Sequence, residues 1–389
     1  MTTVWAFIII IGVLITIHEL GHFIAARSVG IRVERFSIGV PPRFFTITSI
    51  DNAWLVSIFF LKKSKGGLKW GPIFKAKIKK PGRIGSNTEY VIALLPLGGY
   101  VKMAGMIDES MDINIQHQED EFMSKPLWAK LWVLSAGVIM NTILAFMVFT
   151  FISNYQGSPE ISNEPIVSEL QEGRPAELAG IKEGDRFTEV NSQKIDTWSD
   201  LTEIIHSKPN TEINIKILRG QSELDFNITT TFNLVSSDNG VDTLGAIGIA
   251  PEIFFTKISI SDALLMGWIR TIDSFVMIIQ SLKMLVSGTA SVSDLGGPIM
   301  IAQLAGQTAE AGLIPFLTFM SLLSVNLAFL NILPIPGLDG GHIFLHLIEA
   351  IMRRPLTLKT RVTIQQIGMA LLFMLMITVI FQDITRLFH

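Results

Sequence analysis

The sequence contains no cysteine and carries little net charge, and both absences narrow what the chain can do. Without cysteine there are no disulfide bonds, thiolate metal ligands or cysteine nucleophiles, so any metal must be held by histidine and carboxylate side chains. A formal net charge of −3 over 389 residues gives no reason to expect a nucleic-acid partner. Hydrophobic residues make up 49% of the chain, which is too much for an ordinary soluble enzyme and predicts an integral membrane protein.

An apolar run near the N-terminus contains the segment His18-Glu19-Leu20-Gly21-His22. Val4 to Ile17 carries no charge and apolar residues resume at Phe23, which predicts one membrane-spanning helix with ionisable groups inside it. The run lacks a basic start and a small-residue cleavage site, so we do not interpret it as a removable signal peptide. Ionisable groups at this depth are costly and are functional candidates by default.

The spacing within this segment predicts a zinc site. His18 and His22 are four residues apart, so they face the same side of a helix and can share one Zn²⁺, while Glu19 is placed to polarise a metal-bound water. The alternative is a chance HExxH match, which is common in soluble sequences and much less so inside an apolar span. A catalytic zinc site normally needs a third protein ligand.

A third ligand is offered where a later apolar span ends. The segment from about Leu313 closes with Asn331-Ile332-Leu333-Pro334-Ile335-Pro336-Gly337-Leu338-Asp339-Gly340-Gly341. Two prolines and a glycine break the helix, so the backbone must unwind at membrane depth, which is tolerated where it lines a protected cavity. We expect Asp339 to complete the zinc site with His18 and His22. The alternative is that Asp339 only caps the turn after Pro336.

The hydropathy pattern predicts a polytopic α-helical membrane protein with about four transmembrane helices. Basic residues are concentrated in two loops, which carry ten Lys or Arg within about twenty residues of the span ends, whereas the flanks of the external domain carry none. This places both termini outside the cytoplasm and the active site near the cytoplasmic side of the membrane. The expected transmembrane helices are 1–26, 131–153, 313–341 and 366–384, with an amphipathic membrane-surface helical region at 258–288.

The second expected span carries small residues along one face. Gly137, Asn141 and Ala145 recur every four residues. Small residues at this spacing let another helix approach closely, and Asn141 can then hydrogen-bond across the contact.

The cytoplasmic segment 27–130 contains two unusual stretches. Apolar, glycine-punctuated residues near 91–105 are too few to cross a membrane and favour a re-entrant β-hairpin, with an ordinary buried strand pair as the alternative. Between Asp51 and Gly85, short apolar runs alternate with lysines. This stretch fits either an interfacial amphipathic element or a lysine-edged hairpin, and the sequence does not choose between them.

A polar domain, 160–251, separates the second span from the amphipathic region. Its pattern predicts short strands, a helix around Trp198 to His206 and a hairpin at 213–230. The order PAxxAG...GDxFxxVN resembles PDZ domains of membrane and periplasmic proteases, which implies one inserted extracytoplasmic α+β domain. Such a domain can bind a peptide ligand as an added strand. The alternative is that it serves only as a plug that limits access.

Taken together, these motifs resemble the site-2 protease family, in the bacterial RseP branch. The resemblance is carried by HELGH, LPLGGYVKM, GVIMN, the single PDZ-like domain and NILPIPGLDGG, and it spans nearly the whole chain. It implies a zinc metalloendopeptidase of the bacterial inner membrane that acts in regulated intramembrane proteolysis. Its substrates would be single-span membrane proteins such as anti-sigma factors, and remnant signal peptides. The implied residue roles are zinc binding by His18, His22 and Asp339, general-base catalysis by Glu19, and substrate binding by Asn331 and by Gly98, Gly99 and Tyr100 of a re-entrant hairpin.

Two departures and two rival functions accompany the resemblance. The best-known enterobacterial members carry two PDZ domains where this chain has one, and the stretch from Asp51 to Gly85 looks like an insertion. A catalytically silent adaptor that presents its PDZ-like domain is one rival, but Glu19 and Asp339 are both present. A metal transporter is the other, but the sequence lacks the repeated polar spans of an ion pathway.

Overall fold

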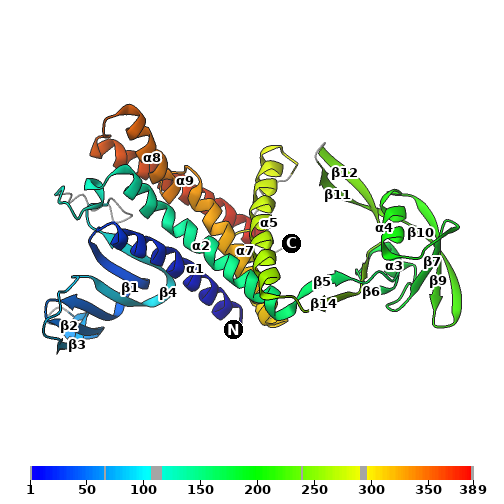
Figure 1. Cartoon of the computed structure of the whole chain (residues 1–389), viewed down its shortest axis with the longest axis horizontal. Coiled ribbons are helices and arrows are strands. Elements are labelled where there is room, and N and C mark those ends of the chain that lie inside the picture. The colour runs from blue at the N-terminus through cyan, green and yellow to red at the C-terminus, as the bar shows by residue number, and fades with distance from the viewer. Residues whose placement is uncertain (1, 65–66, 107–115, 238–239, 290–295, 387–389) are drawn as a thin grey trace. The chain divides into compact units, whose positions relative to one another are not determined.

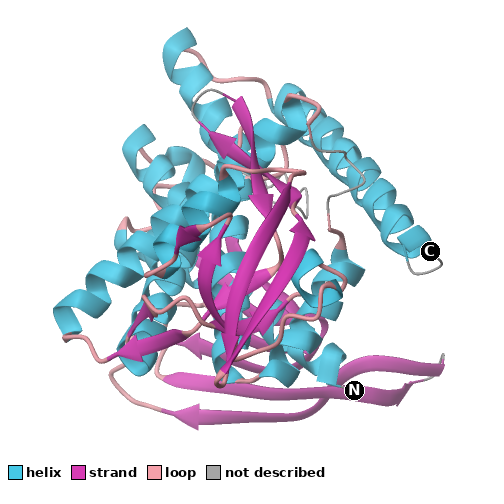
Figure 2. Cartoon of the chain, turned by 90° about the vertical axis from the view of Figure 1, so that its right-hand side faces the viewer, coloured by secondary structure: helices cyan, strands magenta, loops and turns pink. Residues whose placement is uncertain are grey.

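The computed structural model describes residues 2–64, 67–106, 116–237, 240–289 and 296–386, and it divides into two compact units. Unit 1 is Met1–Ser153 with Ile260–His389, and unit 2 is Asn154–Ser259. Among the described residues, strands occur in one sheet of unit 1 and in unit 2, and helices and loops make up the rest of unit 1 (Figure 2). Unit 2 is therefore an insertion between the two chain segments that build unit 1.

Within the described residues, four helices are long and apolar enough to cross a membrane. They are α1 (Thr2–Ser28), α2 (Leu127–Gln156), α7 (Leu313–Ile332) and α9 (Leu358–Arg386), and they run in similar directions in Figure 1. Three of them extend past the expected spans 1–26, 131–153 and 366–384: α1 is longer at its C-terminal end, and α2 and α9 are longer at both ends. The third expected span, 313–341, is interrupted where the prolines predict a break.

The helices of unit 1 approach one another closely through small residues. A Cβ atom on Gly21 of α1 would lie only 2.4 Å from the carbonyl oxygen of Ala136 in α2. Gly137, Asn141 and Ala145 are all buried, as their spacing predicts. About two turns earlier along the same buried stripe of α1, Leu14 packs in an apolar cluster with Met320 of α7. The close contacts fix how the helices are rotated, which decides where the polar side chains of α1 point.

A four-stranded sheet follows α1 in the chain. Its strand order is β3-β2-β1-β4, and β1 and β4 lie against α1. Arg35 of β1 is opposite Lys102 in one arm of β4 and opposite Glu89 in the other arm, so part of β1 lies between the two arms. The bounds are β1 (Val33–Ile50), β2 (Ala53–Ser64), β3 (Gly67–Lys79) and β4 (Glu89–Met103).

This pairing corrects the simple hairpin expected near 91–105. The apolar stretch forms both arms of β4, but each arm pairs with β1. A local pattern within 91–105 carries no information about a strand that comes fifty residues earlier and enters between the arms. The stretch from Asp51 to Gly85 is the lysine-edged hairpin of the two alternatives: β2 and β3 pair antiparallel along their length.

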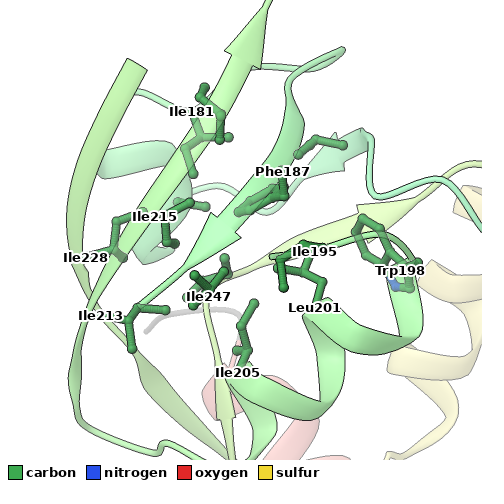
Figure 3. Packing of buried hydrophobic residues seen from close by; sticks show 14 residues of the cluster. Ile181, Phe187, Ile195, Trp198, Leu201, Ile205, Ile213, Ile215, Ile228 and Ile247 are labelled. Carbon is green, nitrogen blue, oxygen red and sulfur yellow. The ribbon is translucent and has the colours of Figure 1, made fainter. Parts of the chain in front are cut away.

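Unit 2 has its own hydrophobic core. Trp198, Leu201 and Ile205 on one face of the helix α4 point toward Phe187 and the strands of a sheet with the order β10-β9-β7-β8 (Figure 3). The predicted helix Trp198–His206 and the hairpin at 213–230 are both present. The elements are β5 (Ser158–Ile161), β6 (Val167–Leu170), α3 (Pro175–Leu178), β7 (Arg186–Val190), β8 (Gln193–Lys194), α4 (Trp198–His206), β9 (Glu212–Arg219), β10 (Ser222–Thr229), β11 (Thr231–Ser237), β12 (Gly240–Ala246), β13 (Ile249–Pro251) and β14 (Ile253–Thr256).

The α4 helix begins where local sequence chemistry predicts. Thr197 accepts a hydrogen bond from the backbone N–H of Asp200, and the Asp200 carboxylate accepts one from the backbone N–H of Thr197. This capping box satisfies donors that the first helical turn leaves without partners. It fixes where α4 begins, and the apolar face of the helix then packs on the sheet.

Unit 1 contains further helices besides the four that are long and apolar enough to cross a membrane. The expected amphipathic region 258–288 is the helix α5 (Ile260–Val286), whose position at a membrane surface stays a prediction. The helix α6 (Pro298–Ala311) was not expected from the sequence. The buried carboxylate of Asp383 in α9 accepts hydrogen bonds from the backbone N–H groups of Gly297 and Ile299, which holds the start of α6. The remaining helices are α8 (Asp339–Met352) and the short 3-10 helix η1 (Phe122–Ser124).

Candidate metal centre and active site

The α1 helix delivers His18, Glu19 and His22 to the interior of unit 1. His18 and His22 are 7% and 5% exposed, so both imidazoles are removed from solvent. Their spacing of four residues places them one above the other, with ring centroids 4.8 Å apart. An apolar helix that buries two imidazoles on one face needs a partner for them, because an unpaired buried polar group is costly.

Asp339 reaches this position because the chain breaks between α7 and α8. Pro334 and Pro336 cannot donate backbone hydrogen bonds, so α7 ends at Ile332, and Gly337 takes a positive φ of 100° to turn the chain. Asp339 is then the first residue of α8, where the positive end of the helix dipole favours a carboxylate.

The two glycines that follow Asp339 let the start of α8 pack tightly against the segment that joins it to α7. A Cβ atom on Gly340 would lie 2.3 Å from the carbonyl oxygen of Leu333, and one on Gly341 would lie 2.3 Å from that of Ile335. Neither position therefore accepts a side chain without moving the backbone. The pair of glycines fixes where α8 starts and where the Asp339 carboxylate points.

The three predicted ligands converge on one point. His18 Nε2 lies 3.1 Å from Asp339 Oδ2, His22 Nε2 lies 3.3 Å from the same oxygen, and the two nitrogens are 3.2 Å apart. A tetrahedral zinc site with bonds of about 2.0–2.1 Å separates its ligands by about 3.3–3.4 Å, close to these three distances. Within the described residues, Asp339 Oδ2 is also a buried atom without a hydrogen-bond donor. The three side chains therefore fit a divalent metal ion, and the fourth tetrahedral position remains for water.

The outer nitrogen of each imidazole meets a group from α2. His22 Nδ1 donates a hydrogen bond of 2.8 Å to the carbonyl oxygen of Val133, so its Nε2 carries the lone pair that a metal needs. His18 Nδ1 faces the amide of Asn141 at 3.4 Å.

The orientation of the Asn141 amide follows from the chemistry of the site. If His18 Nε2 binds a metal, Nδ1 carries the proton and must donate, so Asn141 must present Oδ1 to it. That orientation also supplies a partner for Asn141 Oδ1, which is otherwise buried without one. Both imidazoles are thus held by α2 with Nε2 directed at Asp339.

Glu19 is held beside the ligands by the sheet. Its Oε2 accepts a hydrogen bond of 3.0 Å from the backbone N–H of Val101 in β4. The bond orients the carboxylate at the edge of the ligand triangle, as a general base requires. Gly99 lies next to it, since a Cβ atom there would be 3.7 Å from Glu19 Cγ and only 2.6 Å from the carbonyl oxygen of Ser37.

The predicted substrate-binding residues Gly98, Tyr100 and Asn331 have different surroundings in the structure. Gly98 has a positive φ of 113°, and a Cβ atom on it would be 3.1 Å from Ile15 of α1. Tyr100 interacts with Arg35, whose Nη1 lies 3.1 Å from the Tyr100 hydroxyl, so its hydroxyl is engaged within the sheet. Asn331 is half-buried in the last turn of α7, and among the described residues it takes no part in the polar contacts of the ligand triangle.

Sequence reasoning missed the groups from α2 that face the imidazoles. The spacing of Gly137 and Asn141 indicates helix packing, but not contact with His18. In the structure a Cβ atom on Gly137 would lie 2.5 Å from His18 Cε1, so the imidazole lies flat against the bare backbone of α2. The Val133 carbonyl carries no sequence signal, because every residue has one.

Comparison with known proteins identifies the family. The model of peptidase family M50 matches residues 6–77 and 73–375, which is most of the chain. The chain belongs to peptidase family M50. Family M50 is the site-2 protease family, and the relatives of this chain place it in the RseP branch. The protein is a multi-pass membrane zinc metalloprotease whose cofactor is Zn²⁺.

The relatives cover the whole chain. The regulator of sigma-W protease RasP of Bacillus subtilis is 30% identical, with 100% of this chain and 99% of that protein covered. The zinc metalloprotease RasP of Bacillus licheniformis is 30% identical and the probable protease eep of Enterococcus faecalis is 27% identical, each with full coverage of both chains. Among solved structures, two PDZ domains of SdrC-like proteins each match 23% of this chain with a TM-score of 0.19. The domain from Listeria monocytogenes is 21% identical and 87% of it is covered. The domain from Listeria innocua is 26% identical and 94% of it is covered.

Proposed function

We propose that this family M50 protease cleaves peptide bonds inside the transmembrane segments of single-span membrane proteins. The observation that carries the proposal is the triangle of His18, His22 and Asp339 beside Glu19. Its two histidines belong to α1, a helix long and apolar enough to cross a membrane, and Asp339 is the first residue of α8. At about 1.5 Å of rise per residue, His18 is about 24 Å from the start of α1, well within the length of a span.

Each side chain has a distinct role in the proposed hydrolysis. His18, His22 and Asp339 hold the metal, and the bound Zn²⁺ supplies a Lewis acid to the scissile carbonyl and to the attacking water. Glu19, oriented by the Val101 amide, takes a proton from the water and passes it to the leaving amine. The Val101 hydrogen bond keeps the Glu19 carboxylate in place, and the burial of His18 and His22 limits the access of bulk water.

The substrate must be unwound before it is cut, because a helix hides its own carbonyl groups. The bend of β4 supports a re-entrant position for the strand that would receive it: a Cβ atom on Gly12 of α1 would lie 3.1 Å from the carbonyl oxygen of Pro96. Gly12 is about 24 Å from the C-terminal end of α1 at about 1.5 Å per residue, which is deep in a span. We propose that the backbone around Gly98, Gly99 and Tyr100 holds the extended substrate, with Asn331 contacting its other side.

The basic loops support an orientation in the membrane. We propose that the termini and unit 2 are extracytoplasmic and that the zinc centre lies near the cytoplasmic side of a bacterial inner membrane. Reporter fusions after Gly157 and after Arg354 test this orientation. A cytoplasmic signal from the first fusion would contradict it.

The substrate class is suggested by the relatives. One relative is named a regulator of sigma-W protease. We propose anti-sigma factors of the single-span type, already trimmed by another protease, and remnant signal peptides as substrates of this chain. Membrane peptides that accumulate when Glu19 is replaced by Gln would identify them.

We further propose that unit 2 is a PDZ-like domain that binds the trimmed end of a substrate. Its α4 helix and the strand β13 line a groove of about 170 Å³, with Trp198, Ile205 and Ile249 among the lining residues. The alternative role is exclusion of large substrates. Deleting residues 163–231 distinguishes the two, because loss of exclusion makes untrimmed membrane proteins cleavable, whereas loss of delivery stops cleavage while zinc stays bound.

The decisive experiment measures zinc and cleavage together. The full chain, reconstituted in lipid nanodiscs with a single-span model substrate, should contain one zinc per chain and cut within the transmembrane segment. The Glu19→Gln variant serves as the matched control because it keeps the metal ligands. Cleavage confined to the soluble part of the substrate, or unchanged in Glu19→Gln, would overturn the proposal.

A further inference from the structure

The hairpin formed by β2 and β3 lies at the free edge of the sheet in unit 1. We refer to Ala53–Lys79 as the basic hairpin. It is fastened to the neighbouring strand, because Trp70 Nε1 donates a hydrogen bond of 2.7 Å to the carbonyl oxygen of Arg43 in β1. Figure 1 shows β2 and β3 as the strands of this sheet farthest from the helices. No described residue of the hairpin contributes to the zinc centre, so its features need another explanation.

The charged residues of the basic hairpin and its flanks are all positive. Between Asn52 and Thr88 the sequence carries nine Lys or Arg and no Asp or Glu. Among the described residues, the lysines of the hairpin make no ion pair, and Lys75, Lys77 and Lys79 are exposed. Lys62 and Lys69 are directly opposite each other across the two strands. Opposed like charges destabilise a strand pair, and an anionic partner outside the chain would offset their repulsion.

The two faces of the hairpin differ in chemistry. The pairs Trp54 with Ile78 and Ile58 with Phe74 put apolar side chains on one face, since directly paired residues share a face. The residues between them put Lys75, Lys77 and Lys79 on the other face. Phe74 and Ile78 remain 52% and 56% exposed. An edge strand with exposed apolar residues on one side and lysines on the other is typical of an element that lies in a membrane interface.

The position of the sheet relative to α1 indicates which partner meets this surface. The bend of β4 contacts Gly12 and Ile15 of α1, and α1 is one of the helices able to cross a membrane. The basic hairpin belongs to the same sheet, so inserting the four helices in a bilayer brings the hairpin to the bilayer surface. Lysine side chains can lay their apolar stems along the interface and extend their ammonium groups to phosphates.

We propose that the basic hairpin is a binding surface for anionic phospholipids. Its lysines contact headgroup phosphates, while Phe74 and Ile78 enter the interface between headgroups and acyl chains. The proposal rests on membrane insertion by the four long helices and not on proteolysis. A nucleic acid or an acidic protein could also match the charge, but neither uses the exposed apolar face or the membrane position of the sheet.

The absence of native cysteine allows a direct test. An Ile78→Cys variant of the full chain carries one environment-sensitive fluorophore and is reconstituted in nanodiscs of phosphatidylcholine alone or with phosphatidylglycerol. A nitroxide-labelled lipid then quenches the probe by contact. We expect at least about twofold stronger quenching with phosphatidylglycerol, reduced by high salt because the attraction is electrostatic. A probe at Asn210 in unit 2 should show no such difference.

Charge variants with matched backbones complete the test. Replacing Lys69, Lys75, Lys77, Lys79 and Lys80 by Gln should reduce quenching in phosphatidylglycerol to the level in phosphatidylcholine, whereas replacing the same five by Arg should preserve it. Both variants should retain bound zinc if unit 1 is folded. Equal quenching in the two lipids, or none in either, would overturn the proposal. Lysine-dependent binding of an RNA oligonucleotide without lipid quenching would assign the surface to a nucleic acid instead. Neither outcome depends on whether the protein cleaves a substrate.

Discussion

Asn141 of α2 faces His18 of α1 at 3.4 Å, at the ring nitrogen turned away from Asp339. The contact connects the interface of α1 and α2 to the metal site. The side-chain amide of Asn141 lies in that interface and also fixes the tautomer of His18. The backbone carbonyl oxygen of Asn141 also accepts a hydrogen bond of 2.8 Å from the hydroxyl of Ser324 in α7. Three helices able to cross the membrane therefore meet at one asparagine.

The first prediction concerns this asparagine. Asn141→Leu removes the acceptor for His18 Nδ1–H and should weaken zinc affinity about 10- to 100-fold, the usual range for loss of such an outer contact. Asn141→Asp keeps an acceptor and should retain more affinity. Zinc release to a competing chelator measures both. Equal affinity of wild type and Asn141→Leu would contradict the role assigned to the amide.

A second prediction tests the close approach of α2 to the same imidazole. Gly137→Ala introduces a methyl group that overlaps the His18 ring, because a Cβ atom there would be 2.5 Å from Cε1. The ring must move away from Asp339, so zinc content and cleavage should both fall at least about tenfold. Ser135→Ala, on the same helix and without this overlap, is the control. Full zinc content in Gly137→Ala would show that the site adjusts freely.

The third prediction separates chemistry from metal binding. Glu19→Gln retains an oxygen that can accept the Val101 hydrogen bond but loses the proton acceptor for water. We expect normal zinc content and cleavage at least about 100-fold slower, within the range for loss of a general base. Quantitative cleavage of a single-span substrate and metal analysis of the same sample provide the measurement. An active Glu19→Gln enzyme would exclude Glu19 as the base.

The fourth prediction compares two buried carboxylates. Asp339→Asn removes the anionic ligand and should lower zinc occupancy, whereas Asp383→Asn removes the charge and one acceptor oxygen from the cap of α6 and should leave zinc in place. Metal analysis after dialysis distinguishes them. The comparison controls for the general effect of losing a buried charge in unit 1. Equal zinc occupancy in the two variants would refute the ligand assignment of Asp339.

The fifth prediction concerns the acid stability of unit 2. Burial alone would raise the pKa of Asp185, but hydrogen bonds from Arg219 and from the Lys182 amide outweigh it and hold the pKa below its ordinary 3.8. The folded pKa is depressed, so this carboxylate stabilises unit 2 above about pH 4 and loses its contribution as the pH falls through the folded pKa.

Asp185→Asn should therefore lower the unfolding temperature of isolated residues 154–259 at pH 7, by at least about 4 °C. The difference from wild type should shrink as the pH falls from 3.8 through the lower folded pKa, because the carboxylate of the unfolded wild-type chain then binds a proton and the folded ion pair loses its advantage. Circular dichroism during heating measures both proteins. A difference that is constant from pH 7 to low pH would show that the ion pair is not responsible.

Much of the proposed centre could be predicted from local sequence. The spacing of His18 and His22 fixes a shared face on any helix, and an apolar run of that length predicts a span whatever the rest of the chain does. Pro334 and Pro336 lie within an apolar run, where proline interrupts the helical hydrogen bonding, so the break before Asp339 was predictable as well. In unit 2, the helix Trp198–His206 follows from its apolar periodicity and the Thr197 cap. All of these features depend on interactions within a few residues.

Only the tertiary structure decided the remaining contacts. Part of β1 enters between the arms of β4, and this pairing depends on strands that are far apart in the chain. The Val133 carbonyl meets His22 because Gly21 lets α1 and α2 approach, which sets the rotation of both helices. The sequence by itself determined which side chains could bind zinc. The packing of the helices decided which nitrogen atoms point at Asp339, because hydrogen bonds across an interface depend on the rotation of both surfaces.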